Sequence, residues 1–557
     1  MTDSPNRIAG RSAFLAILKD EGITKLFGNP GTTELPIMHA LKEHSDLDFV
    51  LALQEALVVA MADGYSRASG ELVAVNVHVA PGLGNAMGSI YTSKRSNTPM
   101  IITAGQQEQG HGLEEPLLYD PLVPIATPMV KWATEVTRLE DLPQIMRRAA
   151  KIATTAPTGP VFIALPGDIL NAEAGIDLGK STRVDTRTRP SDAALEGFAK
   201  RILAAKNPAI IAGEEIVTGG AFDEIAEFAD ALGAPAWQQS IAYGSHFPSE
   251  HRTFMGSVLR NQAQVRKTLE PYDLLVFVGA DVLRMSVWQE TDAMPPDMPI
   301  VQIGLNDWEM GKVYPAEIAL RADVKETLKV LTPLVSKLGG AAHKAVAESR
   351  IKALADSNWT AKRAIAVKKA KAKAASVPIN PDWLMMTITD TIPAGTVVVD
   401  EGITSSARLM DFLPYRDRHD FFGMVSGGIG WAAPATVGIQ LAQPARPVVS
   451  IIGDGSLMYS VQSLWTAAHL NLPITYVIAN NRGYRILKQR LLSMHDNDNF
   501  VGMDMTDPPI DFVGLARSLG MTAQCITDPA DFGPALAASI ESRKPTLLEV
   551  IVEDSVR

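Results

Sequence analysis

The chain has 557 residues, of which 46% are hydrophobic and 20% are charged, and this length is too great for a single hydrophobic core. Its net charge of −11, from 51 basic and 62 acidic residues, argues against nucleic acid or an anionic membrane as the main partner. The single cysteine, Cys525, excludes an intrachain disulfide, and no apolar stretch is long enough to span a bilayer, so we expect a cytoplasmic protein.

Short β-branched runs alternate with amphipathic segments along the chain, a pattern that favours α/β layers around parallel sheets. A polar stretch at about 180–191 and an Ala/Lys-rich run at about 340–377 interrupt this pattern. We therefore expect three doubly wound parallel-sheet domains at 1–185, 190–340 and 378–557, with a helical linker at 341–377. The clearest expected strands span residues 73–77, 100–103, 161–164, 274–278, 397–399 and 448–452.

The amino-terminal third carries two candidate proton-transfer groups. Glu55 follows the largely apolar run 51–54 and begins a segment that continues through 60–65, which brings one carboxylate into an apolar setting. A structural acid at a helix start is the alternative. His78 follows the expected strand 73–77, and an imidazole can pass protons near neutral pH, although a histidine at a strand end is more often structural.

The carboxy-terminal third carries the most specific pattern, which is Gly-Asp-Gly-Ser at 453–456 and Asn-Asn at 480–481. Mg²⁺ prefers hard oxygen ligands and is usually shared with phosphate oxygens. The predicted metal ligands are therefore Asp454, the amide oxygen of Asn481 and the backbone carbonyl of Gly483. The glycines allow a phosphate to come close, and a helix that starts here would favour that anion.

Each of these two pieces alone is typical of an ordinary turn. Their separation of 28 positions (481 minus 453) corresponds to about one helix and one strand, which returns the chain to the carboxyl edge of a parallel sheet. The pair resembles the signature of enzymes that use thiamine diphosphate with Mg²⁺.

The resemblance sharpens to the benzoylformate decarboxylase family and extends over nearly the whole chain. It is carried by residues 27–36, 51–65, 85–88, 103–107, 459–460 and 464–468. It implies the fold of thiamine diphosphate-dependent decarboxylases, with an amino-terminal pyrimidine-binding domain, a central domain and a carboxy-terminal diphosphate domain.

The resemblance also implies roles for individual residues around the cofactor. Glu55 is the expected cofactor-activating acid, the Gly427 carbonyl is expected to accept the aminopyrimidine amine, and Ile429 is expected to enforce the bent shape of the cofactor. Other residues expected to contact the cofactor are Asn29, Thr404, Ser405, Gly453, Asp454, Gly455, Ser456, Asn481 and Tyr484.

Three polar side chains lie over the reacting carbon in that family. His78 matches the first catalytic histidine, and Thr32 stands where the family has a serine that binds the substrate carboxylate. Ser286 stands where the family has a second histidine, and serine cannot donate a proton at neutral pH as imidazole can. His111 is a candidate substitute, with an exposed loop histidine as the alternative.

The substrate pocket implied by the resemblance is mostly apolar, which favours an aromatic or bulky apolar acyl group. Arg490 lies near a position where the family has an aromatic residue. Either Arg490 or Arg284 could neutralise an extra substrate carboxylate. The expected pocket residues are Thr32, His78, Leu117, Leu118, Trp288, Tyr484, Leu487 and Arg490.

The expected reaction is non-oxidative decarboxylation of a 2-oxo acid to an aldehyde and CO₂. Loss of the second histidine leaves open an acyloin-forming carboligase or an acetolactate synthase-like enzyme, and a non-catalytic cofactor-binding paralogue or an FAD-bearing synthase is less favoured. The resemblance implies a homotetramer built as a dimer of dimers, in which Glu55 of one chain faces Asp454 and Asn481 of another.

Overall fold

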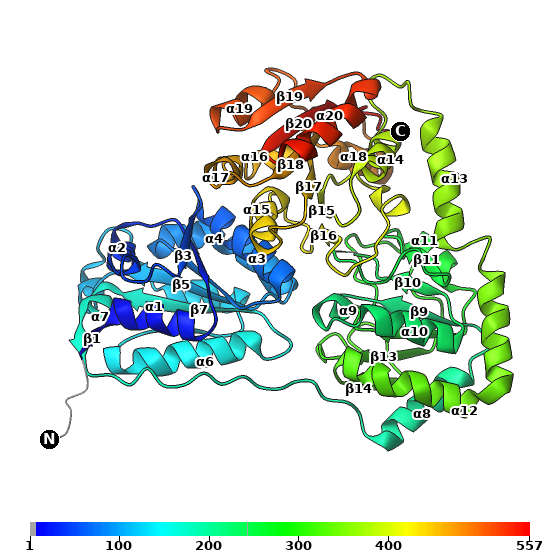
Figure 1. The fold of residues 1–557 in the computed structure, drawn as a ribbon, viewed down its shortest axis with the longest axis horizontal. Coiled ribbons are helices and arrows are strands. Elements are labelled where there is room, and N and C mark those ends of the chain that lie inside the picture. The colour runs from blue at the N-terminus through cyan, green and yellow to red at the C-terminus, as the bar shows by residue number, and fades with distance from the viewer. Residues whose placement is uncertain (1–6, 242, 557) are drawn as a thin grey trace.

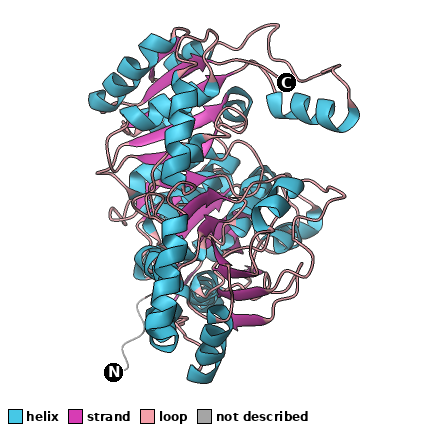
Figure 2. Ribbon diagram, turned by 90° about the vertical axis from the view of Figure 1, so that its right-hand side faces the viewer, coloured by secondary structure: helices cyan, strands magenta, loops and turns pink. Residues whose placement is uncertain are grey.

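The computed structural model describes residues 7–241 and 243–556, which form three α/β units. In Figure 1 the first unit is blue to cyan, the second is green, and the third runs from yellow to red above the other two. Each unit contains a six-stranded sheet in which all strand pairs are parallel. In Figure 2 the strands lie in the interior with helices outside them. The predicted fold class is therefore confirmed.

The strands are parallel and buried because their sequences are nearly continuous apolar runs, which suits sheets covered on both faces. β4 (Val73–Val77) and β12 (Leu274–Val278), for example, are buried at every position. All six expected strands form where the β-branched runs predict them.

The first sheet has the order β3-β2-β4-β5-β7-β6, and a two-stranded ribbon of β1 (Ile8–Ala9) and β8 (Glu173–Ala174) lies beside it. Its other strands are β2 (Lys25–Gly28), β3 (Asp48–Leu51), β5 (Met100–Gln106), β6 (Ala133–Glu135) and β7 (Pro160–Pro166). Its helices are α1 (Gly10–Asp20), α2 (Leu35–Leu41), α3 (Glu55–Ser69), α4 (Val79–Arg95), α5 (Leu122–Ala126), α6 (Leu142–Thr154) and α7 (Gly167–Asn171).

The second sheet has the order β11-β10-β9-β12-β13-β14. Its other strands are β9 (Pro208–Ala212), β10 (Ala236–Gln238), β11 (Phe254–Ser257), β13 (Ile300–Gly304) and β14 (Ile318–Arg321). Its helices are α8 (Asp192–Leu203), α9 (Glu215–Thr218), α10 (Phe222–Leu232), α11 (Gln262–Leu269) and α12 (Val324–Ala353).

The third sheet has the order β16-β15-β17-β18-β20-β19. Its strands are β15 (Val397–Glu401), β16 (Phe421–Gly423), β17 (Val448–Gly453), β18 (Ile474–Asn480), β19 (Thr522–Ile526) and β20 (Thr546–Ile551). Its helices are α14 (Pro381–Thr391), α15 (Ala432–Ala442), α16 (Asp454–Met458), α17 (Ser463–His469), α18 (Arg485–His495), α19 (Phe512–Ser518) and α20 (Pro529–Ser542).

The segment predicted as a helical linker comprises the second half of α12 and α13 (Trp359–Lys371), which runs along the edge of the molecule in Figure 1. These helices pack against the units that they connect, because Ala347 and Trp359 are buried and the Trp359 indole donates to the Met410 carbonyl at 2.8 Å. The exact domain boundaries proposed from the sequence remain predictions. In the described part of the chain, no helix is long and apolar enough to cross a membrane.

The first and third units share one hydrophobic core through the crossing of α3 and α15. Small residues allow this close approach, because a Cβ added to Gly438 would overlap the Met61 carbonyl and one added to Gly64 would overlap the Ala435 carbonyl. The crossing holds the two units in a fixed relation within one chain.

A buried ionic network joins all three units at the end of this crossing. The Asp63 carboxylate accepts hydrogen bonds from the Trp431 indole at 2.8 Å and the Thr98 hydroxyl at 2.6 Å. Arg67 lies 3.9 Å from Asp63 and donates to the carbonyls of Tyr243 at 2.6 Å and Gly423 at 3.2 Å. The Arg67 guanidinium also lies over the Trp431 ring, 4.8 Å from its centroid.

We expect Arg67→Met to lower the free energy of unfolding by about 3 kcal/mol, because the buried Asp63 charge would lose its counter-ion. The urea midpoint of the first unfolding transition measures this effect. Arg189→Met is the control, since Arg189 pairs with Asp192 at an exposed site and its loss should have a much smaller effect. Equal midpoints for the two variants would contradict the structural role of Arg67.

Candidate active site

The predicted site residues gather where the strand order of two sheets reverses, which is where open parallel sheets bind ligands. In the first sheet this point lies between β2 and β4, and Asn29, Thr32 and His78 follow these strands. In the third sheet it lies between β15 and β17, whose carboxyl ends lead to Thr404 and Asp454. We call these groups the pyrimidine half-site and the diphosphate half-site.

Glu55 is the first residue of α3 and is buried, with 7% of its surface exposed. Its two carboxylate oxygens accept hydrogen bonds from the side-chain amides of Asn29 at 3.3 Å and Asn85 at 3.0 Å. The tight packing of Gly82 against its side chain leaves Glu55 little freedom. The structure therefore holds one carboxylate in a fixed position at the edge of the first sheet.

His78 lies between β4 and α4 and is oriented by a residue that we did not predict. The fully buried Glu34 carboxylate lies 2.6 Å from the Nδ1 atom of His78 and accepts hydrogen bonds from the backbone N–H groups of Gly31 and Gly105. Pairing at Nδ1 leaves Nε2 available for proton transfer. Val79, directly after His78, has a φ of 39°, a strained conformation for a β-branched residue of the kind that clusters at functional sites.

We expect Glu34→Gln to lower kcat about 100-fold, because an amide cannot hold the imidazole in the same tautomer as a carboxylate does. Steady-state kinetics measures this loss, and cofactor affinity should change little. Glu34→Asp should recover part of the activity if the carboxylate acts through His78. A collapse in cofactor affinity without a change in kcat would instead indicate a purely structural role.

The predicted metal ligands come together at the amino terminus of α16. Asp454 is 3% exposed and accepts hydrogen bonds from the backbone N–H groups of Gly455 at 2.8 Å and Gly483 at 3.1 Å. The side-chain oxygen of Asn481 lies 3.3 Å from the same Gly483 nitrogen. Burial raises the pKa of Asp454 to about 6, and these backbone hydrogen bonds oppose the shift.

The donor set at Asp454 fits Mg²⁺. Across residues 7–241 and 243–556, no lysine, arginine or histidine nitrogen lies within 4.0 Å of this buried carboxylate, so its charge lacks a side-chain counter-ion. One carboxylate, one amide oxygen and one backbone carbonyl are hard ligands of the type that holds Mg²⁺ together with phosphate oxygens.

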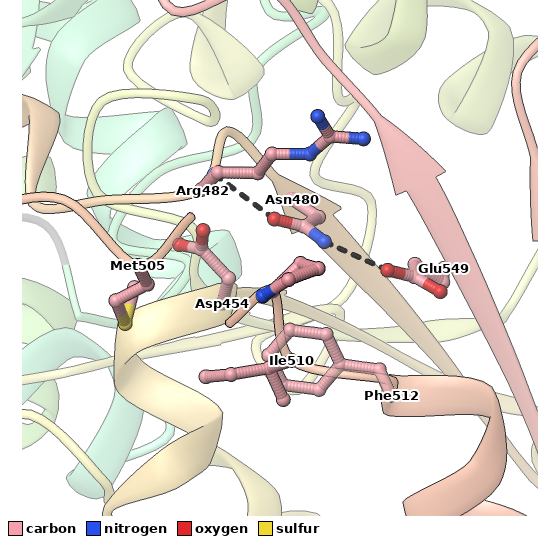
Figure 3. Close-up of a pocket in the computed structure, with 8 residues that line it drawn as sticks. Asp454, Asn480, Arg482, Met505, Ile510, Phe512 and Glu549 are labelled. Carbon is pink, nitrogen blue, oxygen red and sulfur yellow. Dashed lines mark hydrogen bonds between the residues drawn. The ribbon is translucent and has the colours of Figure 1, made fainter. Parts of the chain in front are cut away.

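The turn that carries Asn481 and Gly483 is fixed by Asn480. The Asn480 side chain accepts a hydrogen bond from the Arg482 backbone at 2.9 Å and donates one to Glu549 of β20 at 2.7 Å (Figure 3). Arg482 has a φ of 61°, so the turn depends on this support. A cavity of about 50 Å³ lies beside Asp454 in the same region. Asn480 thus supports the turn, whereas Asn481 is the predicted metal ligand.

The remaining cofactor-binding candidates surround the diphosphate half-site. The buried Arg485 guanidinium donates to the Thr404 hydroxyl at 3.1 Å and to the Ser405 hydroxyl at 3.4 Å, which fixes this loop. Gly427 has a φ of 84°, as a tight loop requires, and Ile429 is partly exposed nearby. Tyr484 packs against Gly455.

Glu401, which we did not predict, connects two parts of this half-site. Its buried carboxylate accepts hydrogen bonds from the Gly430 and Ala432 backbone N–H groups, each at 2.5 Å. It also receives one from the Ser456 hydroxyl, and burial raises its pKa to about 7. The loop that contains Gly427 is thereby held against the helix start that contains Asp454.

Several predicted pocket residues are exposed in the single chain. Leu117 is 85%, Trp288 81% and Leu487 47% exposed, and Thr32 and Ser286 are also exposed. Leu118, at 37%, adopts a φ of 71° in the same loop as Leu117. The structure therefore does not bring these residues together with Glu55 or Asp454 into one enclosed pocket within a chain.

The other singled-out polar residues have different surroundings. His111 is about half exposed and pairs with Glu114 at 3.3 Å, which matches the alternative of an ordinary loop histidine. Arg284 forms an ion pair with Asp281. Arg490 lines a cavity of about 490 Å³ between the second and third units.

Three profiles of one enzyme family match the three units. Residues 8–116 match the N-terminal thiamine pyrophosphate binding domain of thiamine pyrophosphate enzymes, 195–331 match the central domain, and 402–550 match the C-terminal thiamine pyrophosphate binding domain. Benzoylformate decarboxylase of Pseudomonas aeruginosa is 31% identical over 97% of this chain and 98% of its own length. This chain belongs to the thiamine pyrophosphate enzyme family.

Two further members show the range of reactions in this part of the thiamine pyrophosphate enzyme family. The large subunit of acetolactate synthase isozyme 3 of Escherichia coli is 26% identical over 98% of this chain and 95% of its own. The structure of a thiamine diphosphate-dependent 4-hydroxybenzoylformate decarboxylase from Rhodococcus jostii superimposes with a TM-score of 0.87 at 27% identity, covering 99% of this chain and all of that one. Both decarboxylases and synthases are therefore relatives, and the predicted family is confirmed.

Proposed function

We propose that this protein is a thiamine diphosphate- and Mg²⁺-dependent decarboxylase that converts a 2-oxo acid with an aromatic or bulky apolar acyl group to an aldehyde and CO₂. The observation that carries this proposal is the pair of half-sites, one built around Glu55 and His78 and the other around Asp454 and Asn481. Similarity to benzoylformate decarboxylase over nearly the whole chain supports it.

The residues of the diphosphate half-site would hold the metal and the diphosphate. Asp454, Asn481 and the Gly483 carbonyl would bind Mg²⁺, and the amino terminus of α16 would favour the negative charge. Thr404 and Ser405 would donate hydroxyl hydrogen bonds to the diphosphate. When bound, thiamine diphosphate supplies an electron sink that stabilises the charge left by departing CO₂.

The residues of the pyrimidine half-site would position the ring and move protons. Glu55 would exchange a proton with a ring nitrogen, and its two asparagine partners hold the carboxylate in place for that exchange. His78 would pass a proton at Nε2 while Glu34 holds Nδ1. Thr32 would donate its hydroxyl hydrogen to the substrate carboxylate and so orient it.

The active site is proposed to form between two chains of a dimer, within a homotetramer. Among the described residues, no hydrogen bond or ion pair joins Glu55 or His78 to Asp454 or Asn481, and the two half-sites each leave residues exposed. At cofactor and Mg²⁺ concentrations at which each variant alone is inactive, mixing Glu55→Gln and Asp454→Asn chains should restore about a quarter of the activity, because half of the dimers are mixed and each has one intact site. No recovery would place the whole site within one chain.

An acyloin-forming carboligase is the second candidate. Ser286 replaces a family histidine, and an acetolactate synthase subunit is similar over nearly the whole chain. Product analysis of the cofactor-loaded protein, with and without an added acceptor aldehyde, separates the two reactions. Aldehyde and CO₂ as main products support the decarboxylase, whereas acyloin as the main product supports the carboligase and links Ser286 to the change.

An FAD-bearing synthase is less favoured because an acidic side chain lies at the centre of the second sheet, where the nucleotide would bind. The strand order of this sheet reverses between β9 and β12, where a nucleotide would be expected. Here the partly buried Glu215 carboxylate accepts hydrogen bonds from the backbone N–H groups of Leu305 at 2.7 Å and Asn306 at 3.1 Å. Burial raises the pKa of Glu215 to about 7, and its ionised form would repel a phosphate, so we expect the purified protein to be colourless. The presence of Glu55, Asp454 and Asn481 also argues against a non-catalytic paralogue.

A further inference from the structure

A cavity of about 490 Å³ that Arg490 lines lies beside the diphosphate half-site. It lies between the second and third units, and Glu401 and Thr404 of the diphosphate half-site form part of its wall. Its volume is within the range of ordinary small-molecule sites. Apolar side chains of Ile403, Met424 and Ile486 also line it, which suits a carbon chain or a ring.

Two arginine side chains from different units enter this cavity. Arg260 follows β11 of the second unit and Arg490 lies on α18 of the third. In the described residues neither guanidinium lies within 4.0 Å of a carboxylate, and the side-chain bond found for Arg260 is a long donation to the Ser240 carbonyl at 3.4 Å. Two positive charges thus share one cavity without ion-pair partners.

Of the three acidic residues that line the cavity, Asp411 pairs with Arg408, Glu401 binds backbone N–H groups, and Asp400 is the one that acts on Arg260. The Asp400 carboxylate accepts a hydrogen bond from the Gly402 backbone at 2.9 Å, and burial raises its pKa to about 6. Arg260 is an exposed residue, and the protein that covers part of its side chain lowers the pKa of its guanidinium; the Asp400 carboxylate opposes this shift, and the charge of Arg490 adds to it. An additional anion between the guanidiniums would relieve this repulsion.

The carboxylate that leaves as CO₂ is a poor candidate for that anion. A guanidinium against this group would stabilise it in the ground state and slow its departure, since only interactions that strengthen in the transition state accelerate the step. The arginine pair therefore fits an anion at the far end of the acyl group. Guanidinium groups suit this task because they bind planar oxyanions through two parallel hydrogen bonds.

We propose that the substrate is a 2-oxo acid whose acyl group carries a second carboxylate, bound between Arg260 and Arg490. This inference rests on the proposed decarboxylase function and replaces its purely apolar acyl group with one that ends in a carboxylate. An aromatic side chain at this position would close the pocket with an apolar wall. Arg490 instead places a positive charge there.

The test compares substrates that differ only in the distal charge. kcat/KM of the cofactor-loaded protein would be measured for 2-oxoglutarate, 2-oxoadipate and 4-carboxybenzoylformate, each against its distal carboxamide. At least one carboxylate is expected to be favoured about 100-fold over its amide, and Arg490→Leu and Arg260→Leu should remove most of that preference. Arg490→Lys should retain part of it. Arg416→Leu is the control, since Arg416 pairs with Glu250 across the same two units and does not line the cavity.

The outcomes separate this inference from the proposed function. Equal or better use of every amide, or a loss of cofactor affinity in Arg490→Leu in place of a change in preference, would overturn the second carboxylate and leave the decarboxylase standing. If no acid is decarboxylated, the arginine pair can still be tested by calorimetry, which measures how tightly dicarboxylates and their amides bind to the Glu55→Gln protein loaded with cofactor. Dicarboxylates should bind this variant more tightly than their amides, and the difference should disappear with Arg490→Leu; equal binding would reject the pair as an anion site.

Discussion

Replacing Glu55 with glutamine is expected to lower kcat by about 1,000-fold or more, the largest effect of any single change in the pyrimidine half-site. The amide keeps the size of the side chain and can still bond to Asn29 or Asn85, but it cannot exchange a proton with the cofactor ring. Turnover of the cofactor-loaded variant measures the loss.

Two readouts make this result specific to proton transfer. Mg²⁺ and thiamine diphosphate should still bind to Glu55→Gln, because Asp454 and Asn481 lie in the other half-site. Glu43→Gln serves as the matched control, since Glu43 is exposed after α2 and should be replaceable without loss. Wild-type activity in Glu55→Gln would refute the assignment of Glu55.

Replacing Asp454 with asparagine is expected to raise the cofactor concentration needed for half-maximal activity by about 100-fold or more. Asparagine keeps the size of the side chain but only one acceptor oxygen, so it can accept the hydrogen bond from Gly455 or from Gly483 but not both, and the negative charge is lost. Titration of activity and of cofactor binding at fixed Mg²⁺ measures the shift, and excess Mg²⁺ should recover part of the activity.

Asp528→Asn provides a matched control in the same unit. Asp528 caps the amino terminus of α20 and accepts a hydrogen bond from the Ala530 backbone N–H at 2.9 Å, and asparagine is an equally good capping residue. Its cofactor requirement should not change. An Asp454→Asn protein that binds cofactor as the wild type does would remove Asp454 from the metal site.

The sheets and two key positions of the site could be predicted from local sequence. Continuous β-branched runs mark buried parallel strands, and the polar residues that follow them, such as Asp454, fall at a sheet edge by topology alone. The spacing of Asn481 from the same motif adds the return of the next strand. These signals are local, so no knowledge of tertiary contacts is needed to read them.

Glu34 and Glu401 could not be identified in this way, because their roles depend on contacts between distant segments. The Glu34 carboxylate accepts a hydrogen bond from the Gly105 backbone N–H, 71 positions away, and pairs with the imidazole of His78, 44 positions away. Glu401 holds Gly430, 29 positions away. A buried carboxylate that binds backbone N–H groups leaves no pattern in the sequence, since its partners are glycine and alanine nitrogens.

The surroundings of Leu117 and Trp288 show a second limit. Both were predicted from a resemblance to line a pocket, yet a single chain leaves them more than four-fifths exposed. In the proposed dimer, a second chain would cover these exposed apolar groups. Whether they line a pocket is a property of the assembly and not of the fold alone.

The central claim, that the two half-sites work together with thiamine diphosphate and Mg²⁺ to decarboxylate a 2-oxo acid, is tested most directly by measuring CO₂ and aldehyde from reconstituted protein. Protein stripped of cofactor and metal would be supplied with both, with either one alone, or with neither, and offered the neutral and dicarboxylic 2-oxo acids described above. We predict equal amounts of CO₂ and aldehyde only when thiamine diphosphate and Mg²⁺ are both present. Release of CO₂ without thiamine diphosphate, or no release from any acid by protein with both bound, would contradict the account.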